Sequence, residues 1–296
     1  MLTVSVSYPQ KRFITVDHTR IRINTIGIEN RKDGQPVIVF QSGMGTPMGN
    51  WDPILDGVSS FAPLITYDRP GIGESDPDDE MPTIKNVSDR LIKILDYLHI
   101  DPPYIMVGHS LGGVYVRGFA NYYPGLLAGL VIIDPGDFTE TQENKRQYFM
   151  DIGLNDLAID SLFKKFDREA IQNKLKSTAP KSIQNEGKVL EDLRKSDFKE
   201  INDSPLPDIP VHILTGGRYD TPVGLRRKEY NDSLLFRSKM RRRAERWTDV
   251  IQSIDKGMFF YSADAGHFVH IDDPDLAISS IRIVYNDYYQ LKSKKQ

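Results

Sequence analysis

A serine between two glycines, at the end of an apolar run, is the feature of this sequence with the clearest capacity for chemistry. Residues 104–113 read Y-I-M-V-G-H-S-L-G-G, so Ser110 lies two residues after Gly108 and two before Gly112. The apolar run predicts a buried strand, and residues 111–123 predict a helix that ends before a Pro-Gly pair. Small residues at both glycine positions allow a sharp strand-to-helix turn that lifts the serine Oγ clear of the sheet. The pattern predicts a nucleophilic serine.

The residues beside this serine distinguish it from a phosphate-binding turn and suggest how an oxyanion could be held. A nucleotide-binding turn would have glycines where His109 and Leu111 stand. The backbone N–H of Leu111 begins the helix and faces the space beside the serine, where the helix dipole favours negative charge. A second donor is expected from the glycine-rich loop 41–47, Q-S-G-M-G-T-P, through the N–H of Met44. Gly43 allows close approach there.

A serine nucleophile needs a general base, and six histidines are candidates. Three of them occur in a hairpin turn, at a helix end and inside an apolar strand: His18, His99 and His212. His109 is next to the serine, but its side chain leaves the turn in another direction. His267 follows a predicted strand through a short loop and precedes the last helix, which places it at the carboxyl edge of the sheet. We therefore expect His267 to be the base and His270 to be structural.

The histidine in turn needs a carboxylate to fix its tautomer. Asp220 lies on the loop after the apolar run 211–214, and Asp134 lies at the end of the run 129–133. Both positions can reach a histidine loop in a parallel sheet. Chain order and loop context favour Asp220, with Asp134 as the alternative acid.

The elements that must position these residues alternate between strands and helices. A hairpin is expected over residues 11–16 and 19–27. Continuous apolar runs, typical of parallel strands buried on both faces, occur at 36–41, 63–67, 104–107, 129–133, 211–214 and 258–261. Apolar stripes at helical spacing occur at 84–98 and 274–288. This alternation predicts an α/β fold of three layers, with helices on both faces of a mostly parallel sheet.

The strand–helix rhythm stops between residues 137 and 208, which are charged and helix-prone. We interpret this stretch as a helical cap inserted into a core domain formed by residues 1–136 and 209–296. The cap would supply an apolar substrate pocket, and two residues beside the serine would complete it. The candidate substrate contacts are Gly43, His109, Leu154, Leu157, Leu162, Phe163 and Phe166.

Four segments of this chain resemble motifs of the α/β-hydrolase fold superfamily. They are Q-S-G-M-G (41–45), Y-D-R-P-G-I-G-E-S (67–75), G-H-S-L-G-G (108–113) and A-G-H-F-V-H (265–270). The resemblance covers nearly the whole chain and implies Ser110 as nucleophile, Asp220 as acid and His267 as base. It also implies structural roles for Asp68 and Arg69. Many members have His-Gly where this chain has Ser-Gly at 42–43.

Composition narrows the classes of partner. The chain has no cysteine, which excludes disulfides and thiolate metal sites, and its net charge of −3 argues against nucleic acid. No His/Asp/Glu cluster has metal-ligand spacing, and no cofactor motif is complete, because Gly71 and Gly73 lack a third glycine. No apolar run is long enough to span a membrane, and the N-terminus lacks a signal-peptide pattern. We expect a cytoplasmic protein with a small-molecule substrate, although a chain from which a signal peptide had been removed would look the same.

The basic stretch 237–246 carries an apolar stripe at helical spacing. We interpret its arginines as the solvated face of a helix rather than an anion site.

Together these observations predict a serine hydrolase, with a carboxylesterase for small apolar or aromatic esters as the first hypothesis. An aminopeptidase or amidase is the alternative, and it would need a cap carboxylate such as Asp156 or Asp160 to hold the substrate amine. A different class would be a lyase or a ligand-sensing receptor with the same three residues. Ser110 argues against haloalkane and epoxide chemistry, because relatives with those activities use an aspartate nucleophile.

Overall fold

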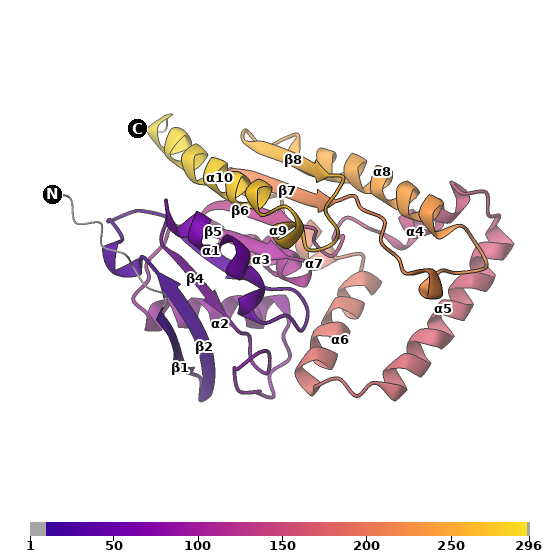
Figure 1. Ribbon diagram of the computed structural model, residues 1–296, viewed down its shortest axis with the longest axis horizontal. Helices are drawn as coiled ribbons and strands as arrows, with labels where there is room; N and C mark the ends of the chain where they lie inside the picture. The colour runs from indigo at the N-terminus through magenta and orange to yellow at the C-terminus, as the bar shows by residue number, and fades with distance from the viewer. Residues whose placement is uncertain (1–9, 295–296) are drawn as a thin grey trace.

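A computed structural model describes residues 10–294, and an eight-stranded sheet forms its centre (Figure 1). The strand order is β1-β2-β4-β3-β5-β6-β7-β8. Strands β3 to β8 are parallel, whereas β2 pairs antiparallel with both β1 and β4. The strands are β1 (Gln10–Val16), β2 (Thr19–Ile26), β3 (Val37–Gln41), β4 (Leu64–Tyr67), β5 (Tyr104–His109), β6 (Leu127–Ile133), β7 (Val211–Gly216) and β8 (Gly257–Ser262). The predicted fold class is confirmed.

Helices cover both faces of this sheet. The α-helices are α1 (Asp52–Ser59), α2 (Ile84–Tyr97), α3 (Leu111–Tyr122), α4 (Gln142–Met150), α5 (Asp156–Lys176), α6 (Lys181–Lys195), α7 (Lys199–Asn202), α8 (Asp232–Ile251), α9 (Val269–Asp272) and α10 (Pro274–Lys294). Short 3₁₀ turns occur at η1 (Ile28–Asn30), η2 (Met48–Trp51), η3 (Pro124–Leu126) and η4 (Val223–Leu225). Within the described residues, no helix is both long and apolar enough to cross a membrane.

Two apolar clusters explain why the central strands are apolar throughout. Helices α2, α3 and α8 pack on one face, where Leu91, Phe119 and Trp247 are buried. Helices α1 and α10 pack on the other face, where Ile54 and Ile281 are buried. Successive side chains of a strand point to opposite faces, so a strand covered on both sides must be apolar at every position. All five residues of β3 are accordingly buried.

Helices α4 to α7 lie between β6 and β7 in the chain, within the region predicted to be an insertion. Helix α6 packs on the core through Val189, Leu190 and Leu193. Helix α5 instead extends away from the sheet and packs against α4 and α8, as Figure 1 shows at its right edge. Among the helices of this region, α6 therefore packs on the core, whereas α5 projects from it.

The arginines of α8 do not all lie on the solvated face that the sequence analysis predicted. Arg242 binds Asp151 on the α4 side, with Nε to Oδ2 at 2.6 Å. Arg243 and Arg246 both bind Asp137, and both arginine side chains are partly buried. These residues face the insertion and the end of β6, because α8 lies between the insertion and the sheet. Their alternation with apolar residues could not indicate which charges meet carboxylates from another part of the chain.

The turn into α3 leaves no space for a side chain at Gly112. A Cβ added there would lie 1.9 Å from the backbone oxygen of Gln41. We expect Gly112→Ala to lower the free energy of unfolding by ~3 kcal/mol or more, because backbone atoms must move to relieve the overlap. Gly187 of α6 has open space around its added Cβ, so Gly187→Ala should raise stability by about 0.5–1 kcal/mol. Urea unfolding midpoints measure both, and equal midpoints for the two variants would contradict this packing.

Candidate active site

Ser110 stands at the turn between β5 and α3 with backbone angles that few residues other than glycine adopt. Its φ is 54° and its ψ is −119°. The turn is fixed by hydrogen bonds, since the Ser110 N–H donates to the Ile133 carbonyl and the Gly136 N–H donates to the Ser110 carbonyl. An added Cβ at Gly108 would lie 2.4 Å from the Gly112 carbonyl oxygen. The predicted sharp turn is therefore present, and its strain is maintained by close backbone packing.

His267 meets Ser110 at this turn. Its Nε2 lies 3.0 Å from the Ser110 Oγ, and its Nδ1 lies 2.5 Å from the Asp134 Oδ2. The histidine comes from the loop between β8 and α9, and the aspartate follows β6 directly. The carboxyl ends of parallel strands gather at one edge of the sheet, which brings together residues far apart in sequence. A serine, an imidazole and a carboxylate that are hydrogen-bonded in this order can move a proton from the serine to the imidazole.

Asp220, the acid favoured by the sequence, does not bond to His267. Its carboxylate lies 3.5 Å from Arg218 Nη2, and its side chain is 63% exposed. Arg218 also pairs with Asp272 at 3.0 Å and donates to the carbonyl of Asp264. The preference for Asp220 is therefore corrected in favour of the alternative, Asp134. Chain order could not separate the two, because both carboxylates lie between the serine and the histidine in sequence.

The environment of Asp134 keeps its carboxylate charged. Burial by itself would raise the pKa of Asp134, but the hydrogen bond with His267 and the charge of Arg243 outweigh it, so the pKa is lowered from its usual value. Thr215 on β7 donates from Oγ1 to Asp134 Oδ1 at 2.7 Å. Arg243 Nη1 lies 3.5 Å from the same oxygen. Three elements, β7, α8 and the histidine loop, thus converge on one buried carboxylate.

The glycine-rich loop after β3 lies directly against the serine. An added Cβ on Gly43 would lie 3.3 Å from the Ser110 Cβ and 3.2 Å from His109 Nδ1. Among residues 10–294, no protein acceptor is found for the backbone N–H of Met44 or of Leu111. Two unpaired donors next to a serine can stabilise an anion that forms there.

His109 and His270 pack behind His267 and act as supports. The Nε2 of His109 lies 2.8 Å from the backbone oxygen of His267, and the Nε2 of His270 lies 2.7 Å from Asn50 Oδ1. The rings of His109 and His270 stand 4.8 Å apart. His270 is buried, as expected of a structural residue. His109 is buried as well, so it supports the loop of His267 instead of forming a wall exposed to substrate.

The expected apolar pocket of the insertion has a different arrangement. Leu154, Phe163 and Phe166 pack with Leu162 in a cluster that joins α4, α5 and α8. Leu162 is buried within this cluster, whereas Leu157 is 81% exposed. Leu162 therefore faces other helices, and Leu157 faces solvent. The sequence predicted apolar side chains here, but it could not indicate that the partners of Leu162, Phe163 and Phe166 are other helices.

The sequence analysis assigned no role to Arg243 or Glu186. Arg243 contacts Asp134, and Glu186 on α6 contacts the loop beside the serine. The only signal for Arg243 was its place in a basic run, and Glu186 had none, because each depends on a partner distant in sequence. No group of three or more metal-ligating His, Asp or Glu side chains occurs in residues 10–294.

Three buried histidines generate a prediction about pH. Burial lowers the pKa of His109 and of His212 to about 4, and that of His270 to about 3. In the unfolded chain each would titrate near ~6.5. The unfolded state thus binds protons first on acidification, and stability falls as the pH drops from ~6.5 toward 4, by up to about 1.4 kcal/mol per pH unit for each histidine. Urea unfolding between pH 7 and pH 5 measures this slope.

A pair of variants separates this effect from general acid sensitivity. His212 is buried and bonds Ser280, far from Ser110. His18, in contrast, is exposed in the first hairpin turn. His212→Asn should make the decline shallower, and His18→Asn should leave it unchanged. Identical slopes in both variants would contradict the assigned protonation.

Comparisons with known proteins find a matching family model and several similar proteins. Residues 38–279 match the model of the alpha/beta hydrolase family. A curated relative, 3-oxoadipate enol-lactonase 1 of Acinetobacter baylyi, is 28% identical over 197 residues, which cover 63% of this chain and 73% of the relative. The enol-lactonase structure from Burkholderia xenovorans LB400 aligns over 94% of this chain and 100% of that chain, with a TM-score of 0.56 and 16% sequence identity.

Other curated relatives match over a smaller share of their length. The uncharacterized protein YqjL of Bacillus subtilis is 32% identical over 108 residues, which are 36% of this chain and 43% of that protein. A probable transporter, efuK, of Hormonema carpetanum is 32% identical over 132 residues, which are 43% of this chain and only 19% of that protein.

The family model covers most of the sheet and all three residues of the hydrogen-bonded chain. This protein therefore belongs to the alpha/beta hydrolase family.

Proposed function

We propose that this protein is a serine hydrolase that cleaves a carboxylic ester through an acyl-serine intermediate. The observation that carries the proposal is the continuous hydrogen-bonded chain from Ser110 through His267 to Asp134. A serine activated by an imidazole attacks the carbonyl carbon of a carboxylic ester and forms an acyl-serine. A small apolar or aromatic ester is the form that we propose.

In the first half-reaction, His267 takes the proton of Ser110 as the Oγ attacks the ester carbonyl. The N–H groups of Met44 and Leu111 hold the oxyanion, and His267 then donates its proton to the leaving alcohol. In the second half-reaction, His267 activates a water molecule that releases the acid. Asp134, kept ionised by Arg243 and Thr215, stabilises the imidazolium that forms in both halves.

The names of relatives support an ester-like substrate. The Acinetobacter relative is an enol-lactonase, and a lactone is a cyclic ester. A relative from Caulobacter vibrioides, 31% identical over 104 residues, is a putative carbamate hydrolase. These names support attack on a carbonyl carbon bonded to oxygen.

We further propose that residues 137–208 form a cap over the site, with the core formed by residues 1–136 and 209–296. The position of α6 supports this role, because the helix packs on the core and its Glu186 bonds the loop beside the serine.

The aminopeptidase alternative gains no support from the two carboxylates suggested for it. Asp156 and Asp160 each lie 2.6 Å from a nitrogen of Arg146. Carboxylates already paired with an arginine are less able to hold a substrate amine. The ester hypothesis therefore remains the better supported one.

The nucleophile assignment predicts that Ser110→Ala lowers turnover of p-nitrophenyl acetate by about 10⁴-fold or more, because no other group can form the acyl intermediate. Ser59→Ala, at the end of α1, serves as the matched control and should retain wild-type turnover. Stopped-flow detection of nitrophenolate measures both. Substantial turnover in Ser110→Ala would exclude this serine as the nucleophile.

The same assay with p-nitrophenyl esters of increasing acyl length, thioesters and aminoacyl anilides measures which carbonyl is preferred. The proposal expects the esters to be the best substrates.

The acid assignment predicts different outcomes for two otherwise similar substitutions. Asp134→Asn should lower kcat on the order of 10⁴-fold, because an amide cannot hold the imidazole in the productive tautomer. Asp220→Asn should leave kcat nearly unchanged, since that carboxylate pairs with Arg218. Steady-state kinetics with one ester measures both, and a larger loss in Asp220→Asn would refute the choice of Asp134.

A further inference from the structure

The loop that carries Met44 is held from behind by a buried arginine. Arg69, just after β4, donates from Nη1 to the Ser42 carbonyl at 2.6 Å and from Nη2 to the Gly43 carbonyl at 2.7 Å. Its guanidinium carbon lies 5.3 Å from the centre of the Tyr115 ring. These contacts orient the two peptide groups that precede Met44. A structural role for Arg69 was expected, and its target is the loop beside the serine.

The inserted helix α6 supplies the counter-charge for this arginine. Glu186 accepts from Arg69 Nε at 2.7 Å, and its second oxygen accepts from the Gly45 N–H at 2.8 Å. The side chains of Arg69 and Glu186 are only 3% and 2% exposed. Although burial works against the charge of Arg69, the carboxylate of Glu186 outweighs it and raises the pKa of Arg69. One carboxylate thus contacts the loop both directly and through the arginine.

Two further residues of α6 fix the helix against the core on the same face. Ser182 donates from Oγ to the Gly71 carbonyl at 2.7 Å. An added Cβ on Gly45 would lie 3.0 Å from Ile183 Cδ1, so this side chain lies against the loop. The helix therefore meets the loop through a hydrogen bond and a packed apolar side chain, and it meets Arg69 through an ion pair.

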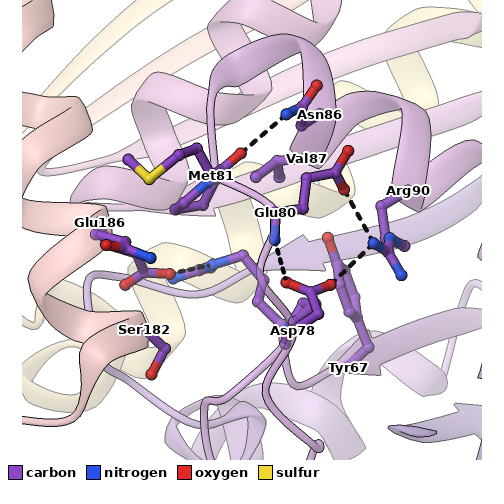
Figure 2. Close-up of a pocket in the computed structure, with 13 residues that line it drawn as sticks. Tyr67, Asp78, Glu80, Met81, Asn86, Val87, Arg90, Ser182 and Glu186 are labelled. Carbon is purple, nitrogen blue, oxygen red and sulfur yellow. Dashed lines mark hydrogen bonds and ion pairs between the residues drawn. The ribbon is translucent and has the colours of Figure 1, made fainter. Parts of the chain in front are cut away.

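A cavity of about 40 Å³ lies behind this contact and includes Arg69 and Glu186 in its wall. Figure 2 shows Glu186 and Ser182 on one side of it, and Asp78, Glu80 and Arg90 on the other. Neither Ser110 nor His267 lines the cavity. The ion pair thus stands between the cavity and the loop, away from the space in front of the serine where a substrate must lie.

We propose that Glu186 is a positioning residue, which sets the Met44 N–H against Ser110 by holding the loop 42–46 directly and through Arg69. This inference rests on the proposed function, because it assigns that N–H to the oxyanion. The insertion then does more than cover the site, since one of its side chains completes the geometry of the loop.

The physical reason lies in the direction of each contact. Arg69 holds two carbonyl oxygens on one side of Met44, and Glu186 holds an N–H on the other side, so the Met44 peptide between them has little freedom to turn. Without the carboxylate, the arginine would be buried without its counter-charge, and the Gly45 N–H would lose its acceptor. In other enzymes, loss of one oxyanion donor lowers kcat by about 10²–10³-fold. A misplaced donor should cost a part of that.

The experiment compares Glu186→Gln with Glu191→Gln, which removes an exposed carboxylate from the same helix. Glu186→Gln should lower kcat for a p-nitrophenyl ester by about 10–100-fold with a smaller change in KM. Its affinity for a trifluoromethyl ketone, which forms a tetrahedral oxyanion on the serine, should fall by a similar factor. Hydrogen exchange of residues 42–46 should become faster. Glu191→Gln should match the wild type in all three measurements.

Each outcome bears on the proposal. Wild-type exchange rates and ketone affinity in a folded Glu186→Gln variant would overturn it. Faster exchange of the loop with unchanged kcat would overturn the link to the oxyanion while leaving the proposed function intact. A wild-type protein that neither hydrolyses esters nor binds the ketone would refute the proposed function, and this inference with it.

A second variant guards against a folding failure. Glu186→Asp keeps the charge but is too short to reach both Arg69 and the Gly45 N–H, so it should show a reduced kcat at a near-normal urea midpoint. Unchanged kcat and exchange in that variant would also overturn the proposal.

Discussion

The close approach of the turn at Ser110 to the end of β3 is the constraint on which the rest of the site depends. A serine at positive φ is held there because the backbone of α3 begins against the carbonyl of Gln41, where no side chain fits at Gly112. The same contact brings the loop after β3 beside the serine. Within residues 10–294, the backbone N–H groups of Leu111, at the start of α3, and of Met44, in that loop, have no protein acceptor. The turn at Ser110 and the position of that loop are thus products of a single packing arrangement.

The carboxylate of Asp134, which ends the hydrogen-bonded series from Ser110 through His267, is held by charges and hydrogen bonds rather than by the turn. Asp134 is buried, which would by itself favour its neutral form, and it stays charged because His267, Thr215 and Arg243 surround it. Arg243 comes from α8, the helix that also binds the insertion through Arg242. The helix therefore serves two purposes, since it joins the insertion to the core and brings a positive charge to the end of β6. A buried carboxylate with several partners has little freedom to move, which favours a fixed imidazole.

The insertion and the core are linked on opposite sides of the site. On one side, α8 binds α4 and Asp137 through arginines. On the other, Glu186 of α6 binds Arg69 and the loop beside the serine. Helix α5 lies farther out and is held by an apolar cluster of its own. This cluster meets the first ionic contact at Tyr148, because Arg246, which binds Asp137, also donates to the Tyr148 hydroxyl at 2.9 Å.

The sequence by itself determined the fold class, the strands and helices of the core, the turn at Ser110 and the pairing of that serine with His267. The fold class, the elements and the turn follow from local patterns, since apolar runs, helical stripes and glycines at a tight turn depend on residues close together in the chain. The pairing with His267 follows from the fold class, because the loops after parallel strands gather at one edge of the sheet. Only the tertiary structure decided between Asp134 and Asp220, gave Arg243 and Glu186 their partners and assigned the apolar residues of α5 to a helix cluster. Each of those outcomes depends on which side chains meet across the edge of the sheet. Two carboxylates with equally suitable positions in the chain differ only in which neighbours bury them and balance their charge, and sequence spacing carries no information about that.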